Sequence, residues 1–135
     1  MKPRWTGARY RTRTCLAGAL AAVGTGAVIA AAHIVAIAWD VGGRFSHTST
    51  VPPGKFFEVC GKFEAGARVK WEFDATAPLD FNIHYHAGKD VVFPAKLSQV
   101  STARDELVAG VTQDFCWMWT NKAQRSADVR VSLSR

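Results

Sequence analysis

The sequence predicts an all-β fold, an antiparallel β-sandwich of the jelly-roll kind, preceded by one N-terminal helix that serves as a transmembrane segment or a signal peptide. Three observations predict it. After residue 55, apolar and polar side chains alternate with a period of two, which is typical of strands with one buried face. Short glycine-containing turns separate these stretches. Residues 15–39 contain no formally charged side chain, so an apolar segment precedes the folded domain.

The alternation is strongest in three stretches, residues 68–74, 79–86 and 128–133. In each of them every second side chain is apolar and the residues between are charged or polar, so we expect one face to be buried and the other solvated. Residues 56–60 and 90–94 are shorter candidates for strands. Many short strands with regular turns favour a sandwich over other all-β architectures.

Residues 97–110 have no clear period. Charged and helix-forming residues closed by Gly110 are compatible with a short helix, and a long polar loop fits equally well. In residues 114–119, three aromatic side chains share one face of a regular strand and are expected to lie in the core. The aromatic residues predicted to fill the core are Trp71, Phe73, Phe81, Phe115, Trp117 and Trp119.

The net charge of +6 comes almost entirely from the N-terminal tail. Residues 1–14 contain five basic side chains and no acidic one, whereas residues 40–135 contain twelve basic and eleven acidic side chains. The folded part is therefore nearly neutral and carries no basic stripe interleaved with aromatic residues. This distribution argues against nucleic acid as a partner.

Residues 15–39 are long enough to cross a membrane. A helix of these 25 residues reaches about 37 Å, and a bilayer core is about 30 Å thick. Residues 1–14 would then form a cytoplasmic tail and place the rest of the chain outside the cytoplasm. A cleaved signal peptide is the alternative, because Ala36-Ile37-Ala38 resembles a cleavage site, although the apolar run is longer than usual. With either outcome the domain is exported to the periplasmic or extracellular side.

Residues 40–54 are rich in glycine, serine, threonine and proline, so we expect them to link the apolar segment to a β-sandwich at residues 55–135. His47 falls in this linker and is expected to be solvated. His33 lies within the apolar segment, where no role for it is evident. Cys15, at the start of that segment, has no evident partner.

The other two cysteines, Cys60 and Cys116, both lie in the exported part. Outside the cytoplasm, two thiols in one small domain usually pair. A disulfide that closes a loop of about 57 residues would stabilise the fold by about 4 kcal/mol on the chain-entropy model.

Three features, in order along the chain, resemble the GOLD domain of the emp24/gp25L/p24 family. Cys60 enters an early strand, and "FNIHYH" is a strand with a glycine turn after it. "DFCWMWTN", residues 114–121, is similar to the aromatic-Cys-aromatic-x-Asn signature of that family, and the alternating strand "ADVRVSLS" follows. The resemblance covers residues 50–135. It implies a β-sandwich in which Cys60 and Cys116 are disulfide-bonded, acting as a protein- or lipid-binding module.

The chain departs from the GOLD family in the order of its parts. Family members place a coiled coil, a membrane helix and a cytosolic sorting tail after the domain, whereas this chain carries its apolar segment before the domain and stops at Arg135. We therefore expect the binding role of GOLD domains to apply here, and vesicle-cargo transport not to.

His84 and His86 point to the same side of their predicted strand and form a candidate metal site. Imidazole combined with a thioether favours copper, so Met118 is the third candidate ligand, provided that its strand lies beside theirs. A blue-copper centre is not expected, because no histidine follows residue 86. If Cys116 is in a disulfide, it cannot be a ligand. The alternative is that both histidines are ordinary residues on the solvated face of a sheet.

These features predict a membrane-anchored, extracytoplasmic binding module that acts on a protein partner at the cell envelope. A periplasmic copper-binding or copper-delivery protein is one alternative, and a small accessory subunit of a membrane complex is another. We do not expect an enzyme, because the sequence shows no nucleophile elbow, no phosphate-binding glycine loop and no paired carboxylates at a telling spacing. No cofactor other than copper is suggested, and the oligomeric state is left open.

Overall fold

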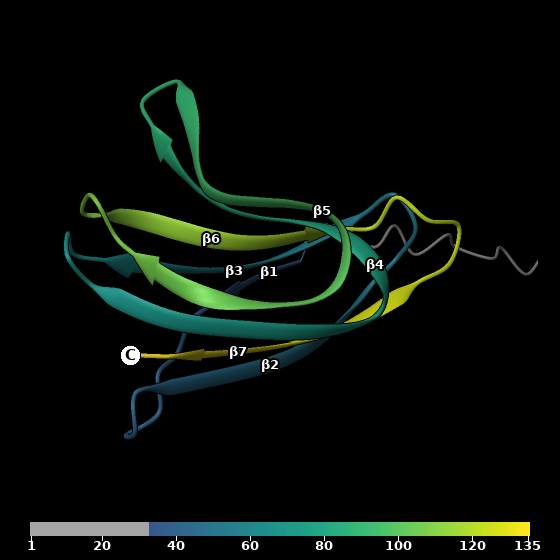
Figure 1. Cartoon of the computed structure of the whole chain (residues 1–135), viewed down its shortest axis with the longest axis horizontal. Helices are drawn as coiled ribbons and strands as arrows, with labels where there is room; N and C mark the ends of the chain where they lie inside the picture. The colour runs from purple at the N-terminus through teal and green to yellow at the C-terminus, as the bar shows by residue number, and fades with distance from the viewer. Residues whose placement is uncertain (1–32) are drawn as a thin grey trace, which may run out of the picture.

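The structure is a computed structural model that describes residues 33–135 of the chain, and all its regular elements in that range are β-strands. They form one curled sheet with the order β1-β3-β6-β4-β7-β2, and β5 pairs with β4. Figure 1 shows β2 and β7 on one side of the molecule, β6, β3 and β1 on the other, and β4 with β5 bending between them. The strands are β1 (His33–Ala36), β2 (Arg44–Val51), β3 (Phe56–Phe63), β4 (Arg68–Ala87), β5 (Asp90–Val108), β6 (Gln113–Thr120) and β7 (Ala127–Ser134).

The prediction of an all-β fold is confirmed, and the curl of the sheet encloses one apolar core. The six aromatic residues expected there are buried, and Trp117 and Trp119 are fully so. Strand β7 shows the pattern most simply, because Ala127, Val129, Val131 and Leu133 are buried and the residues between them are not. The period-two alternation thus follows directly from one face of each strand being packed inside.

Strand β4 is long enough to belong to both sides of the molecule. Residues 70–75 pair with β7, and residues 80–84 pair with β6. The pairing of β4 with β5 shifts register between Asp74 and Leu79, around Pro78, which has no N–H to donate to a neighbouring strand. This bend carries the second half of β4 across the core and sets His84 beside β6.

Strand β5 bends with β4 at Gln99, which has a positive φ of 51°. Oδ1 of Asp80 accepts hydrogen bonds from the Gln99 backbone N–H at 3.1 Å and from its Nε2 at 2.9 Å. Hydrogen bonds from Lys122 and Gln99 lower the pKa of Asp80 to about 2. The ionised carboxylate therefore fixes the bulge from which the β4–β5 hairpin projects.

The N-terminal segment differs from the prediction at its C-terminal end. Residues 33–36, expected to end a helix, form β1 and pair in parallel with β3. The Ile37 N–H continues the ladder by donating to the Cys60 carbonyl at 2.9 Å, and the side chains of Ile37 and Trp39 pack on the core. An apolar run can be covered by lipid or by the edge of a sheet, and the composition of the run does not distinguish the two. Residues 1–32, with the rest of that predicted segment, lie outside the described residues.

Within residues 33–135 no helix has the length and apolar character needed to cross a membrane.

The predicted linker at residues 40–54 is wrong over Arg44–Val51, which form β2 and pair with β7 along their whole length. Its serine and threonine residues resemble a linker in composition, but alternate side chains point inward and end at the fully buried Val51. The folded domain therefore includes β1 and β2 and is not confined to residues 55–135. Residues 97–110 were expected as a helix or a loop, and most of them belong to β5.

Asn121, the last residue of the "DFCWMWTN" motif, is fully buried and holds two loops together. Its Nδ2 donates to the carbonyls of Val51 and Arg125, both at 2.8 Å, and its Oδ1 accepts from the Ala123 N–H at 2.9 Å. The asparagine of this motif thus has a structural role in satisfying buried backbone groups.

Candidate functional site

Strands β3, β6 and β4 are neighbours, and the face that they turn away from the core carries two rows of polar and sulfur-containing side chains. The register places Glu58 opposite Met118 and Met118 opposite Asn82 in one row. In the next row Cys60 lies opposite Cys116, which lies opposite His84. Three adjacent strands therefore supply all the side chains of this site.

The two cysteines form a disulfide, as predicted. Cys60 and Cys116 lie directly opposite each other on β3 and β6, with their Cα atoms 4.1 Å apart and a sequence separation of 56. The bond cross-links the strands that carry Glu58 and Met118. Because both sulfurs are in the disulfide, neither can serve as a thiolate ligand.

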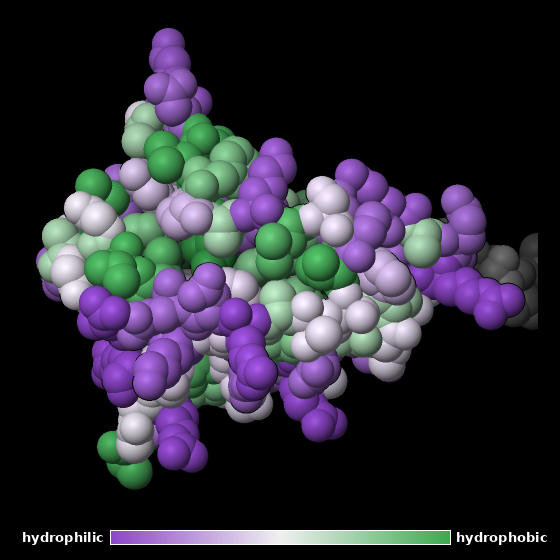
Figure 2. Space-filling view, in the orientation of Figure 1, coloured by the Kyte–Doolittle hydropathy of each residue, from purple (hydrophilic) through white to green (hydrophobic). Residues whose placement is uncertain are grey.

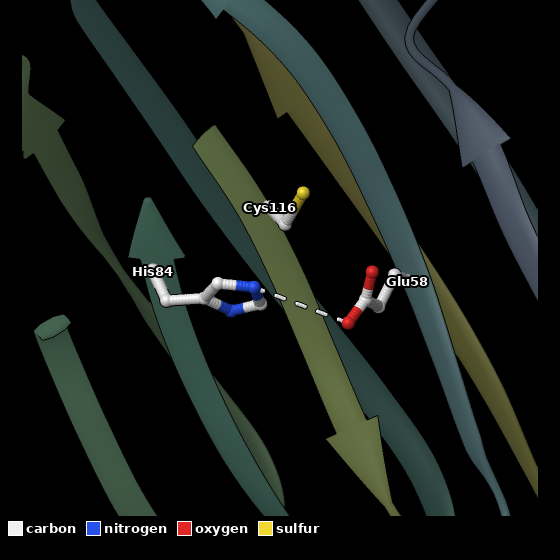
Figure 3. A group of neighbouring side chains, drawn as sticks. All are labelled: Glu58, His84 and Cys116. Carbon is white, nitrogen blue, oxygen red and sulfur yellow. Dashed lines mark ion pairs between the residues drawn. The ribbon is translucent and has the colours of Figure 1, made fainter. Parts of the chain in front are cut away.

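His84 and Glu58 face each other across β6, next to the disulfide (Figure 3). His84 Nε2 and Glu58 Oε1 are 4.0 Å apart, and the two side chains are only 8% and 12% exposed. On the other side of the ring, His84 Nδ1 lies 2.8 Å from Asn82 Oδ1, a carbonyl oxygen that can only accept. His84 therefore donates through Nδ1–H, and its Nε2 lone pair is directed at Glu58. The His86 ring is next to that of His84, with ring centroids 5.5 Å apart.

Burial shifts the pKa of both facing groups toward their neutral forms. Desolvation raises the pKa of Glu58, and the nearby His86 lowers it by a smaller amount. Desolvation also lowers the pKa of His84, and the charge of His86 lowers it further. The 4.0 Å approach of these groups is thus not a strong ion pair, because desolvation outweighs their mutual attraction.

The hypothesis of a shared metal site required the strands of the histidines and of Met118 to be neighbours. They are, and Met118 lies on the same face as His84, one cross-strand pair along. Glu58 was missed from the sequence, and it is the residue whose carboxylate approaches His84 most closely. The available signal was its place in "FFEVC", where it alternates with buried Phe57 and Val59 and precedes Cys60 by two residues.

The β4–β5 hairpin continues this face beyond the body of the domain, and Figure 1 shows it projecting from the curled sheet. The Phe93 ring lies over His84 with centroids 6.0 Å apart, and Lys96 Nζ lies 5.0 Å from the centre of the Phe93 ring. Figure 2 shows hydrophobic residues gathered on this projection. Its exposed large apolar residues are Val91, Val92, Phe93 and Leu97.

A second pair of histidines lies where the two edge strands of the sheet approach each other. His47, expected in a solvated linker, is on β2 and stacks on Phe57 with ring centroids 5.5 Å apart. The His33 ring is 6.1 Å from that of His47, and its Nδ1 is 3.5 Å from Ser49 Oγ. The contacts of this pair are with aromatic rings and a hydroxyl, so it helps to close the seam between β1 and β2.

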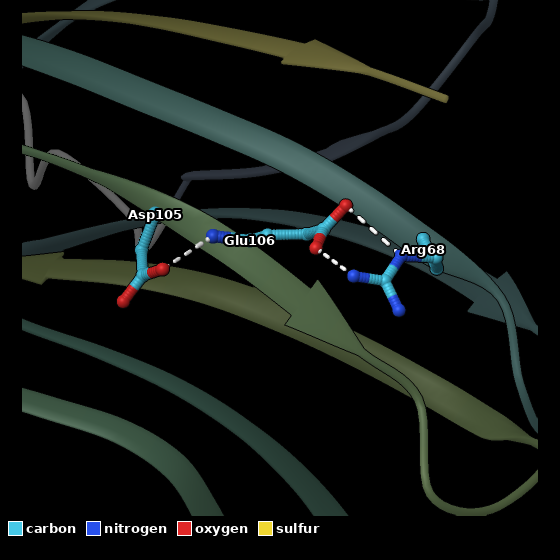
Figure 4. A network of polar contacts seen from close by, with 3 residues as sticks. All are labelled: Arg68, Asp105 and Glu106. Carbon is cyan, nitrogen blue, oxygen red and sulfur yellow. Dashed lines mark hydrogen bonds and ion pairs between the residues drawn. The ribbon is translucent and has the colours of Figure 1, made fainter.

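A broad groove of about 1030 Å³ lies between the first half of β4, the second half of β5 and the ends of β2 and β7. At its margin Glu106 pairs with the guanidinium of Arg68, and the Glu106 N–H donates to Asp105 Oδ1 at 2.8 Å (Figure 4). The charges of the groove nearly cancel, so it presents no concentrated charge to a ligand. Its charged lining residues are Asp40, Arg44, Lys70, Glu72, Arg104, Asp105 and Glu106.

Comparison with known proteins gives likenesses in structure only. No family model and no curated protein sequence matches the chain. The periplasmic inhibitor of g-type lysozyme PliG from Aeromonas hydrophila is similar in structure, with a TM-score of 0.54 and 8% identity over 76% of this chain and 95% of PliG. These likenesses show the fold alone.

Two further structures of similar fold come from proteins with other roles. The pre-peptidase C-terminal domain of a Bacillus anthracis collagenase has a TM-score of 0.55 at 6% identity, covering 76% of this chain and 94% of that domain. The Yersinia pseudotuberculosis-derived mitogen has a TM-score of 0.54 at 10% identity, covering 70% and 86%. None of the three is described as a GOLD domain, and the GOLD resemblance stays a prediction from sequence motifs.

Proposed function

We propose that this protein is an extracytoplasmic binding module that recognises a protein partner through its β4–β5 hairpin. The observation that carries the proposal is the projection of this hairpin with Val91, Val92, Phe93 and Leu97 exposed at one end of the domain. Contiguous exposed apolar residues on a small domain mark interaction surfaces, and an aromatic residue among them is a typical binding anchor. The similarity in fold to PliG, described as a periplasmic inhibitor of g-type lysozyme, supports the proposal.

The surroundings of Phe93 suit it to be such an anchor. Its ring lies beside His84 and the Lys96 ammonium, and these contacts reduce the side-chain entropy that is lost on binding. The hairpin itself is supported from below by Tyr85, whose ring packs against Phe115 with centroids 5.0 Å apart. A rigid, partly apolar projection of this kind binds through a few central residues.

Site-specific photo-crosslinking tests this function in cells that export the protein. A photoreactive residue in place of Phe93 is expected to give a discrete protein adduct. Val108 is the matched control, because it lies on the same strand and is 50% exposed, against 45% for Phe93, but pairs with Arg68 at the opposite end of the hairpin from its projecting tip. The same adducts from both positions, or none from position 93, would contradict the proposal.

Export is supported by the Cys60–Cys116 disulfide, since such bonds persist outside the reducing cytoplasm. The position of β1 also changes where we expect the N-terminal apolar segment to be cleaved. Because His33 already belongs to the domain, the uncharged run left for a leader is residues 15–32. As a helix those 18 residues would reach about 27 Å, slightly less than the roughly 30 Å of a bilayer core.

We therefore expect a signal peptide that is cleaved between Ala32 and His33, after the small-residue site Ala30-Ala31-Ala32. Cleavage at the site expected earlier, after Ala38, would remove β1 and the packing of Ile37. Intact-mass analysis of the exported protein measures this directly and is expected to place the N-terminus at His33. Recovery of the uncleaved chain in membranes would instead support the membrane-anchored form, with an accessory role in a membrane complex.

A further inference from the structure

We propose that Glu58, His84 and His86 form a binding site for a divalent transition-metal ion, Zn²⁺ or Cu²⁺. This site goes beyond the protein-binding role of the hairpin. It also differs from the copper site suggested by the sequence, since a carboxylate from β3 replaces the thioether of Met118 as the third ligand.

The gap between the first two ligand atoms is close to the size that an ion requires. Glu58 Oε1 and His84 Nε2 are 4.0 Å apart, which is too far for a hydrogen bond. Nitrogen and oxygen ligands lie about 2.0–2.2 Å from Zn²⁺, which places two ligand atoms of a tetrahedral site about 3.4 Å apart, so the two groups would close by about half an ångström around one ion. His86 lies two residues along the same strand face with its ring 5.5 Å from that of His84, centroid to centroid. The side chains whose ligand atoms already converge are Glu58, His84 and Cys116, so the exposed His86 would turn toward Glu58 and His84 to complete the site.

The orientation of His84 favours binding through Nε2. Its Nδ1–H donates to Asn82 Oδ1 at 2.8 Å, which fixes the tautomer and leaves the Nε2 lone pair pointing at Glu58. Metal-binding histidines commonly hold their second ring nitrogen in this way. Asn82 is itself buried, so this support is part of the packed sheet.

The carboxylate of Glu58 lacks a partner that would explain its burial. Its other contact, 3.8 Å from Cys60 Sγ, is not a hydrogen bond, because a disulfide sulfur has no proton to donate. No other residue in the described range 33–135 hydrogen-bonds to its oxygens. Desolvation makes the charged form of this partly buried group costly, and an ion held with two imidazoles would offset that cost.

The ligand set defines the class of ion. Two imidazole nitrogens and one carboxylate oxygen suit borderline divalent ions such as Zn²⁺ and Cu²⁺, whereas soft Cu⁺ prefers thiolate or thioether sulfur. The disulfide removes Cys116 as a thiolate, so the nitrogen and oxygen atoms remain as the strong donors. With three protein ligands, a fourth position would stay open for water or for a group of the partner.

Calorimetric titration of the full chain, purified without a histidine tag, with ZnCl₂ and with CuCl₂ tests the proposal. We expect one ion per chain with at least one of the two salts, bound with micromolar affinity or tighter. His86→Ala and Glu58→Gln are each expected to weaken binding by more than about 10-fold, since changes even in residues that only support a ligand cost 10–100-fold. His86 is exposed, so its replacement leaves the fold intact and keeps the test valid if the buried variants misfold.

His47→Ala and Met118→Leu are the matched controls. His47 is a histidine at the seam, away from the site, and Met118 is the thioether on the same face. Both variants are expected to bind the ion as the natural chain does. The proposal fails if neither ion binds stoichiometrically, or if His86→Ala binds as well as the natural chain. If Met118→Leu weakened ion binding as much as His86→Ala does, the third ligand would be the Met118 sulfur and the assignment of Glu58 would be wrong.

Discussion

Replacing both Cys60 and Cys116 with alanine is expected to lower the free energy of unfolding by about 4 kcal/mol, the chain-entropy value for a closed loop of this length. The two residues join β3 to β6 across 56 positions of sequence, so the unfolded chain gains much freedom when the bond is lost. A loss of that size is a large part of the 5–15 kcal/mol typical of a domain. Urea unfolding followed by tryptophan fluorescence measures it, because Trp117 and Trp119 are fully buried.

Reductant provides the internal control for this measurement. It should lower the unfolding midpoint of the natural chain toward that of the double variant and leave the variant unchanged. A difference below about 1 kcal/mol would mean that the β3–β6 ladder and the core fix these strands without help from the covalent bond, contrary to expectation.

A chain that begins at Lys55 is expected not to fold cooperatively, whereas a chain that begins at His33 is expected to fold like the complete domain. The shorter chain lacks β1 and β2, which cover the free edges of β3 and β7. It also loses fully buried Val51 and the packing of Ile37 and Trp39 on the core. At about 1.5–3 kcal/mol for each fully buried large apolar side chain, and somewhat less for the partly buried ones, these losses approach the whole stability of a small domain.

Near-ultraviolet circular dichroism and urea titration of the two chains measure this difference. The His33 chain should show a fixed aromatic signal and a single sharp transition. The Lys55 chain should show neither, and its exposed strand edges should make it aggregate. Equal midpoints for the two chains would restore the predicted domain boundary at residue 55 and reduce β1 and β2 to accessory strands.

Much of the fold could be predicted because period-two alternation is a local property. Residues 68–74 and 128–133 bury every second side chain, and Leu79, Phe81 and Ile83 are buried as that spacing predicts. The other face of 79–86 was expected to be solvated, but Asn82 and His84 on it are buried as well. The alternation in β2 was missed because its inward-facing residues include His47 and Ser49, which composition assigns to solvent. These side chains face inward at the open seam of the sheet, where polar atoms still reach water or each other.

The candidate site could be predicted only in part. The histidine pair and its common face followed from the strand pattern, and the disulfide followed from the cysteine count and the exported location. Glu58 could not be assigned, because its approach to His84 depends on β6 lying between β3 and β4. Strand order is set by long-range pairing, and nothing in the spacing between residues 58 and 84 specifies it.

The sequence by itself determined that the domain is all-β, which side chains form its aromatic core and that two cysteines would cross-link it. Each of these depends on residue type and on neighbours a few positions away. The tertiary structure decided that residues 33–36 and 44–51 are edge strands and that Glu58 faces His84 beside the disulfide. The composition of a stretch does not specify which surface will cover it, because its burial depends on long-range contacts with strands far away in the sequence.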